Sequence, residues 1–133
     1  MKVAPQAIPD GRGLRIAVLH AAFNAPIVRG LLDGCLSALG AMGVSEGAIR
    51  CIAVPGAFEL PLVARAVAEE GRVDAIVALG AVIRGDTDHY EHVAREAAAG
   101  LAAVSLGTRV PVAFGVLTVR KAAQAVARAK PDG

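Results

Sequence analysis

The sequence predicts an α/β fold, a three-layer sandwich in which a parallel β-sheet is covered by helices on both faces. Segments with the character of strands and segments with the period of helices alternate four times, separated by short turns that contain glycine. The apolar run that ends at Gly80 has the composition of a buried strand. Successive units of one strand and one helix are typical of a parallel sheet.

The first unit consists of a strand over residues 14–20 and a long helix that ends near residue 42. Asn24 follows the connecting loop and has the type of side chain that caps a helix. Gly43 comes directly after the last residue with helical periodicity, where glycine commonly ends a helix.

The second unit pairs a strand at about residues 49–54 with a helix from about residue 59 to residue 70. The turn at 54–58 joins the two segments. Pro61 falls in the first helical turn, where the N–H group that proline lacks has no partner within the helix. Gly71 follows the helix and ends the unit.

The third unit has a strand at 74–79, a long polar loop, and a helix from about residue 88 to residue 105. Thr87 has a side chain that can cap this helix. The fourth unit combines a strand at 111–118 with a helix from about residue 119 to residue 130. Residues 14–130 are therefore expected to form a single domain, and residues 1–13 an N-terminal extension.

Composition and charge exclude several classes of function. The net charge of +2 comes from Arg and Lys scattered among Asp and Glu, so the sequence does not support nucleic-acid binding. No charge-free stretch approaches the ~20 apolar residues of a membrane-spanning helix, and we expect a cytoplasmic protein without membrane contact. Cys35 and Cys51 are expected to be buried, reduced thiols. The high mean hydropathy of +0.54 in a small chain predicts an oligomer.

The predicted sheet places four loops where a ligand can bind. Ligands of parallel sheets bind beyond the carboxyl ends of the strands, so the loops at 21–24, 55–59, 81–89 and 114–118 should converge. N–H groups at the start of the third helix attract phosphate. No dinucleotide fingerprint and no nucleotide-binding phosphate loop is present, which argues against both ligand classes.

Four short motifs are carried by this framework, at Phe23-Asn24, Pro55–Glu59, Gly80–His89 and Pro111–Thr118. In order and separation they resemble the 6,7-dimethyl-8-ribityllumazine synthase family over about residues 13–130. The resemblance implies a flavodoxin-like fold with strand order 2-1-3-4. It also implies a transferase of riboflavin biosynthesis that needs no cofactor and no metal.

The reaction of this family, the penultimate step of riboflavin biosynthesis, joins two small substrates. 5-Amino-6-ribitylaminouracil condenses with 3,4-dihydroxy-2-butanone 4-phosphate, and the products are 6,7-dimethyl-8-ribityllumazine, phosphate and water. The resemblance implies that the pyrimidine is bound by Phe23, Ala57, Phe58, Glu59, Ala81, Val82, Ile83 and Phe114. Phe23 would stack on the pyrimidine ring, with a ring that caps the core as the alternative. For Glu59 the alternative is a carboxylate that complements a helix dipole.

The same resemblance implies that the phosphate of the butanone substrate is bound by Asp86, Thr87 and Arg128. Asp86 would bind through its amide, because its carboxylate repels the dianion. Simple helix capping is the alternative for Asp86 and Thr87, and a solvated surface position is the alternative for Arg128.

His89 is the implied general acid and base, and an imidazole titrates near ~6.5, close to the working pH. Chelation of a metal by His89 and His92 is a weaker alternative, because the sequence offers no further ligand at the usual spacing. His92 is instead expected to be a surface or packing residue.

The resemblance further implies a homopentamer with shared active sites, to which Phe114 and Arg128 are donated by a neighbouring subunit. Decamers and icosahedral shells of sixty subunits are the larger assemblies of the family, and riboflavin synthase is a candidate partner. The family continues past the Arg128 position into a C-terminal helix that is missing here. A truncated or engineered oligomer or cage subunit without turnover is therefore the alternative function, and a flavin- or lumazine-binding module is a weaker one.

Overall fold

A four-stranded parallel sheet forms the centre of the computed structural model, which describes residues 7–86 and 88–131. The strand order is β2-β1-β3-β4, as predicted. The bounds of the strands are β1 (Ile16–Ala21), β2 (Ile49–Val54), β3 (Ala75–Ile83) and β4 (Val112–Val119). Every pair of neighbouring strands runs parallel.

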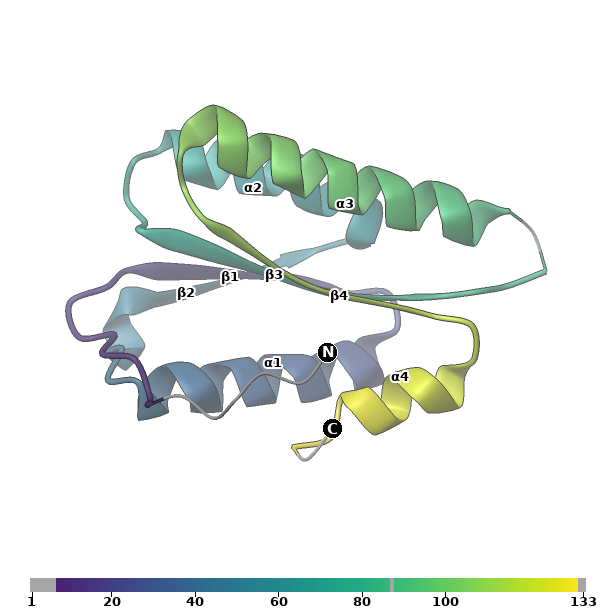
Figure 1. Cartoon of the computed structure of the whole chain (residues 1–133), viewed down its shortest axis with the longest axis horizontal. Coiled ribbons are helices and arrows are strands. Elements are labelled where there is room, and N and C mark those ends of the chain that lie inside the picture. Colours follow the sequence, from purple (N-terminus) through teal and green to yellow (C-terminus); the bar gives the residue numbers. More distant parts are fainter. Residues whose placement is uncertain (1–6, 87, 132–133) are drawn as a thin grey trace.

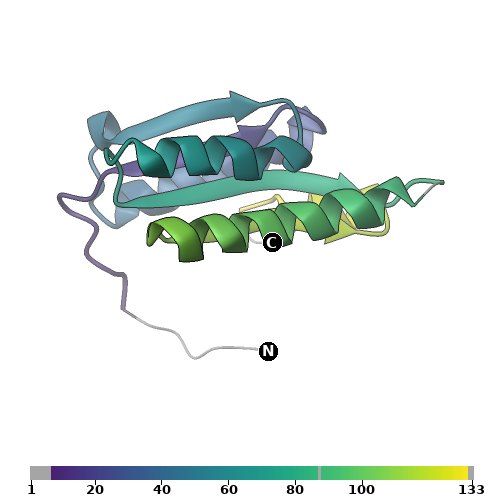
Figure 2. The same ribbon diagram turned by 90° about the horizontal axis from the view of Figure 1, so that it is seen from above.

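Helices cover both faces of this sheet, which confirms the three-layer sandwich. The helices are α1 (Ala25–Ala41), α2 (Leu60–Glu69), α3 (His89–Thr108) and α4 (Ala122–Arg128), with short 3-10 turns at η1 (Glu46–Ala48) and η2 (Ala57–Glu59). In Figure 1, α2 and α3 lie above the sheet, and α1 and α4 lie below it. Figure 2 shows α2 and α3 side by side over the strands.

The third strand is longer than predicted, and this changes the loops. β3 continues past Leu79 to Ile83, because β4 pairs with it in register as far as the partners Ile83 and Val119. Residues 81–83 therefore belong to a strand. The prediction of a loop at residues 114–118 is also wrong, since those residues lie inside β4.

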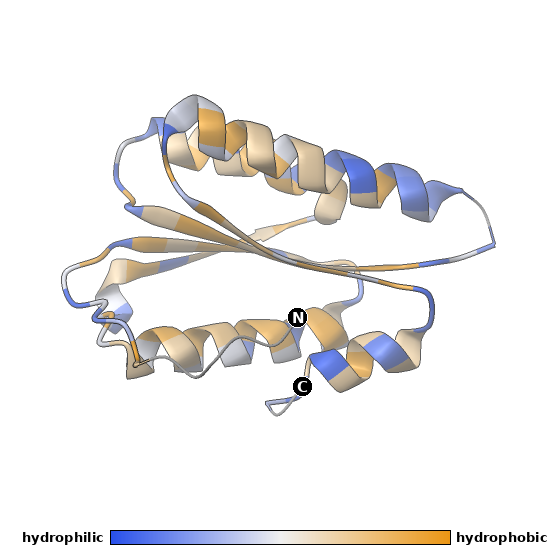
Figure 3. Ribbon diagram, in the orientation of Figure 1, coloured by the Kyte–Doolittle hydropathy of each residue, from blue (hydrophilic) through white to orange (hydrophobic). Residues whose placement is uncertain are grey.

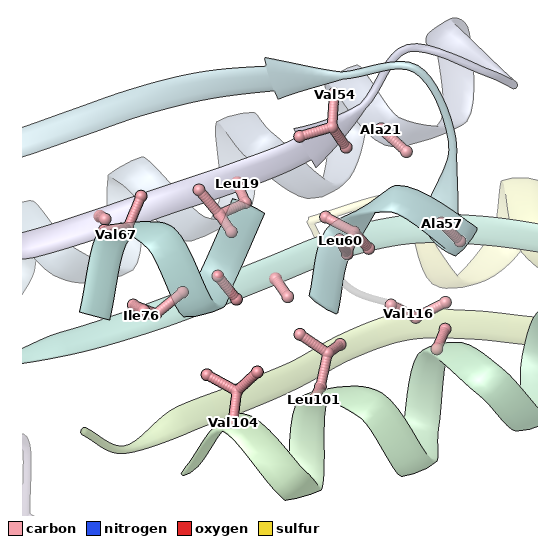
Figure 4. Close-up of a cluster of buried hydrophobic side chains, with 14 of the residues drawn as sticks. Leu19, Ala21, Val54, Ala57, Leu60, Val67, Ile76, Leu101, Val104 and Val116 are labelled. Carbon is pink, nitrogen blue, oxygen red and sulfur yellow. The ribbon is translucent and has the colours of Figure 1, made fainter. Parts of the chain in front are cut away.

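The main core fills the space between the sheet and the pair α2 and α3. Side chains alternate along a strand, so Leu19 faces this core while Val18 faces α1 in a second cluster. Figure 4 shows Leu60 of α2, Leu101 of α3 and Ile76 of β3 among the side chains of this core. All five side chains are almost completely buried.

Helix boundaries follow the local residues closely. Gly43 has a φ of +91°, a backbone conformation that side chains disfavour, and it lies just beyond α1 as predicted. Pro61 is in the first turn of α2. α3 begins at His89 with Asp88 in the N-cap position, whereas the predicted cap, Thr87, lies outside the described residues.

The two cysteines differ in their surroundings. Cys35 is half-buried, and this burial raises the pKa of its thiol. Cys51 was predicted to be buried but is exposed, because β2 is the edge strand of the sheet.

Among the helices of the described ranges, none combines the length and apolarity required to cross a membrane.

Candidate active site

A pocket of about 520 Å³ opens at the carboxyl ends of the strands, where the sequence predicted a ligand site. Its lining comes from four separate segments of the chain, namely residues 23–24, residues 55–59, residues 81–83, and the side chains of His89, Tyr90, His92 and Val93. The volume is in the range of sites that bind small molecules and cofactors. The fold thus brings together most of the predicted site residues.

The first wall follows β1. Hydrogen bonds from the N–H of Ala22 to the carbonyl of Val54, 2.7 Å, and from the N–H of Phe23 to that of Pro55, 3.1 Å, tie this segment to the end of β2. The Phe23 side chain is 72% exposed although it lines the pocket. The residue is therefore too exposed to cap the core, and its ring is accessible to a ligand in the pocket.

Asn24 occupies the N-cap position of α1 but does not cap the helix. Its backbone is left-handed, with φ 60° and ψ 42°, and its side chain makes no hydrogen bond to the first turn. Instead, Nδ2 donates a hydrogen bond of 2.9 Å to the carbonyl oxygen of Ala81. The predicted capping role is wrong, because the side chain is turned toward β3.

The second wall is η2 at the start of α2. Ala57 is buried, whereas the Phe58 side chain is 58% exposed. Glu59 is half-buried at the N-cap position of α2, and its Oε1 atom lies over Gly56. The Glu59 carboxylate thus lies both at a helix start, as its alternative role requires, and on the pocket wall.

The floor of the pocket is the end of β3. Ala81 and Val82 are buried and Ile83 is half-buried. Gly80 precedes them in β3, and a Cβ added there would lie at ordinary van der Waals distance, 3.6 Å, from the Cβ atoms of Ala21 and Ala57. Among residues 81–83 Ala81 has the smallest side chain, so a ligand can approach the backbone most closely there.

The third wall is the first part of α3. His89 is exposed and Tyr90 is half-buried, and both line the pocket. His92 is exposed, which agrees with the expected surface position, and together with Val93 it also lines the pocket. The spacing of three and four residues from His89 could have indicated this, because such residues share a helix face. Figure 3 shows hydrophilic residues along this part of α3.

Three predicted site residues are not part of this pocket. Asp86 is exposed in the loop between β3 and α3 and does not line the cavity. Phe114 lies inside β4 opposite Ala78, well before the strand end, and is 49% exposed. Arg128 is on α4, below the sheet in Figure 1, and its Nη1 donates to the carbonyl of Gln124 at 3.1 Å.

The remaining predicted site residue, Thr87, lies outside the described ranges. Within those ranges the pocket lining contains no Lys and no Arg. The described part of the chain also holds no group of three or more His, Cys, Asp or Glu side chains placed to bind a metal ion.

The pocket combines flat apolar surfaces with a few polar groups. Phe23, Phe58 and Tyr90 supply rings, Glu59 supplies a carboxylate, and His89 supplies an imidazole. Such a set can bind a planar heterocycle and move protons at its edge. Fold and pocket together define the class, a flavodoxin-like α/β protein with a pocket of small-molecule size beyond the strand ends.

Comparison with known proteins gives the family. The family model described as 6,7-dimethyl-8-ribityllumazine synthase matches residues 13–133. Proteins of that name from Burkholderia multivorans and Azoarcus sp. are each 44% identical to this chain, and the one from Chromobacterium violaceum is 47% identical. Each match covers 93% of this chain, together with 72% of the Burkholderia protein and 80% of the other two.

The chain belongs to the 6,7-dimethyl-8-ribityllumazine synthase family, as the motifs indicated. This places it among the transferases of riboflavin biosynthesis.

Proposed function

We infer that this chain condenses 5-amino-6-ribitylaminouracil with 3,4-dihydroxy-2-butanone 4-phosphate to give 6,7-dimethyl-8-ribityllumazine, phosphate and water. One observation carries the proposal. A single pocket is lined by Phe23, residues 57–59, residues 81–83 and His89, which are the residues that the family resemblance assigns to the pyrimidine and to proton transfer. These segments are distant in the sequence and meet only through the fold.

The pyrimidine substrate is proposed to lie against the exposed ring of Phe23. Backbone groups of residues 57–59 and 81–83 would bind the polar edge of the ring and the ribityl hydroxyls, with the Glu59 carboxylate as one further acceptor. Support comes from the small side chains at Ala57 and Ala81, which let a ligand approach the backbone.

His89 is proposed to move protons during dehydration of the carbinolamine, departure of phosphate and ring closure. The amine of the pyrimidine is itself the nucleophile, so no covalent bond to the protein is needed. Holding the two substrates in reacting geometry can contribute ~7–11 kcal/mol toward the barrier. The position of His89 on the pocket wall, at the first residue of α3, supports this role.

The phosphate is proposed to bind at Asp86 and Thr87 through backbone amides, with Arg128 of a neighbouring subunit as the counter-charge. Arg128 lies on the other side of the sheet from α3, and Phe114 lies before the end of its strand. Both residues would therefore reach a pocket only in another copy of the chain. Exposed apolar side chains support a subunit contact, since Leu106 is 84% and Leu62 75% exposed.

A homopentamer is the proposed assembly, with decamers or sixty-subunit shells as larger forms and riboflavin synthase as the candidate partner. A cytoplasmic location belongs to the same proposal and is supported by the free thiols of Cys35 and Cys51.

The decisive experiment mixes the purified chain with both substrates and follows the fluorescence of the lumazine. We expect product only when both substrates are present, with one equivalent of phosphate released for each lumazine. Reactions that lack one substrate or the protein are the controls. Absence of enzymatic product would overturn the proposal and favour a subunit that keeps the fold without turnover.

A further inference from the structure

Asn24 has an unusual backbone for its place in the fold. Among the non-glycine residues that the structure describes, only Asn24 and Arg109 have a positive φ, 60° and 63° respectively. A left-handed backbone is unfavourable for most side chains, although asparagine tolerates it better than most. Arg109 simply follows the C-terminal end of α3. Asn24 instead lies at the pocket, where its conformation has a structural consequence.

The left-handed backbone turns the Asn24 side chain toward the carbonyl of Ala81, which lies past the end of the pairing between β1 and β3. Pairing of β1 with β3 ends at the partners His20 and Leu79, whereas β3 continues to Ile83. The Ala81 carbonyl lies beyond this last pair and accepts the hydrogen bond of 2.9 Å from Asn24 Nδ2. The amide therefore replaces the strand neighbour that β3 lacks at this point.

The same segment is also tied to β2. The N–H groups of Ala22 and Phe23 donate hydrogen bonds to the carbonyls of Val54 and Pro55, respectively. The backbone on either side of the Phe23 side chain is thus held between the ends of β2 and β3. Because the ring itself is 72% exposed, packing around the ring contributes little to its position. The hydrogen bonds of the backbone and of Asn24 must set it.

We propose that Asn24 is a positioning residue that holds the Phe23 ring over the pocket through its hydrogen bond to Ala81. Asn24 acts through Phe23 and need not react with any substrate. The effect on catalysis rests on the proposed function, in which Phe23 stacks on the pyrimidine. The effect on the order of the ring does not depend on that function and can be measured alone.

The first test reports the order of the ring without substrate. The chain contains no tryptophan, so the Phe23→Trp variant carries a single tryptophan, which can be excited selectively in the presence of Tyr90. Adding Asn24→Asp keeps the size of the side chain but removes the N–H donor. We expect the amplitude of nanosecond local motion in the anisotropy decay to rise about twofold. Asn24→Gly, which also keeps the left-handed backbone accessible, should have the same effect.

Arg109→Gly in the same Phe23→Trp background is the matched control, because it changes the other left-handed residue at the far end of α3. It should leave the local motion unchanged. Circular dichroism confirms that each variant is folded. If Asn24→Asp leaves the motion of the tryptophan as it was, the proposal is wrong, whatever Asn24→Gly does.

The second test uses turnover in chains that retain Phe23. Loss of one neutral hydrogen bond should raise the KM for the ribitylaminopyrimidine about three- to tenfold in Asn24→Gly, which adds no charge to the pocket, with a smaller change in kcat. A purely structural role for Asn24 would lower the amount of folded enzyme and leave KM unaltered, and that result would overturn the proposal. Absence of turnover in the unaltered chain would overturn the proposed function, while the anisotropy test still decides the role of Asn24.

Discussion

Individual histidines of this chain differ in what surrounds them. His89 and His92 line the pocket from α3, whereas His20 lies in β1 between its partners Ala53 and Leu79. Only an imidazole that faces the bound substrates can transfer protons to them. Position in the fold, rather than the presence of an imidazole, therefore decides which histidine can act in catalysis.

His89→Ala should lower kcat/KM for lumazine formation by about 10²- to 10⁴-fold, the usual contribution of a general acid or base. Steady-state fluorescence of the product measures this rate. His20→Gln is the matched control and should retain the rate per folded molecule, because His20 does not line the pocket. Equal rates for His89→Ala and the unaltered chain would exclude proton transfer by His89.

At the scale of elements, α2 and α3 approach each other closely beside the pocket. A Cβ added to Gly100 of α3 would lie 2.6 Å from Cγ and 2.7 Å from Cβ of Pro61. The proline ring is rigid and cannot move aside. Gly100 therefore sets the distance between the two helices that carry the second and third walls of the pocket.

Gly100→Ala should decrease the free energy of unfolding by about 1–3 kcal/mol, because the added methyl group forces the helices apart. Chemical denaturation measures the change. Gly34→Ala is the matched control, since a Cβ at Gly34 of α1 meets nothing within 4 Å. That change should stabilise the chain by about 0.5–1 kcal/mol, through helix propensity alone. A neutral Gly100→Ala would mean that the helices can separate freely.

At the same scale, hydrogen bonds between Arg15 and Asp74 join the starts of β1 and β3. The Asp74 carboxylate accepts hydrogen bonds from the backbone N–H of Arg15, 2.7 Å, and from its guanidinium, while the Asp74 N–H donates to the Arg15 carbonyl at 2.7 Å. The side-chain hydrogen bond from Arg15, and then the backbone one, lower the pKa of Asp74 below its ordinary value of 3.8. The ionised carboxylate is thus preferred in the folded chain.

Asp74→Asn should destabilise the fold at neutral pH, and the difference from the unaltered chain should disappear in acid. A lowered pKa means that the contribution of Asp74 is complete above its unfolded value of 3.8 and is lost as the pH falls through the lower folded value. Urea denaturation at a series of pH values measures this. Asp33→Asn on the exposed surface of α1 is the control. A difference that persists at the lowest pH would contradict the assignment.

At the scale of the whole molecule, the described pocket lining of one chain offers no Lys or Arg to the phosphate of the proposed substrate. Within the described part of the chain its lining holds Glu59, His89 and His92 but neither Lys nor Arg. Arg128 projects from α4, which covers the opposite face of the sheet. If Arg128 serves catalysis, assembly must bring it to the pocket of another subunit.

Mixing two slow variants tests this arrangement. His89→Ala and Arg128→Ala should each be slow alone. Unfolding and refolding them together in equal amounts should restore about a quarter of the unaltered activity, because random assembly pairs an intact His89 with a neighbour's intact Arg128 at one site in four. Fluorescence of the lumazine reports the rate. No recovery in assembled mixtures would show that both residues act within one chain.

The sequence alone was enough for the alternation of strands and helices, and for much of the pocket. β2 has the predicted bounds, and Gly43 and Pro61 have the predicted places at helix ends. The motifs at Phe23, residues 55–59 and residues 81–83 were correctly expected to converge. These features are predictable because helix and strand periodicity, proline and glycine act over a few neighbouring residues, and parallel strand ends meet at one edge.

Only the tertiary structure decided the length of β3, the partner of Asn24 and the separation of Arg128 from the pocket. β3 reaches Ile83 because β4 pairs with it, and Asn24 bonds to Ala81 because β1 ends earlier than β3. Arg128 lies away from His89 because α4 covers the other face of the sheet. Each outcome depends on register and packing between segments far apart in the chain, and local sequence patterns contain neither.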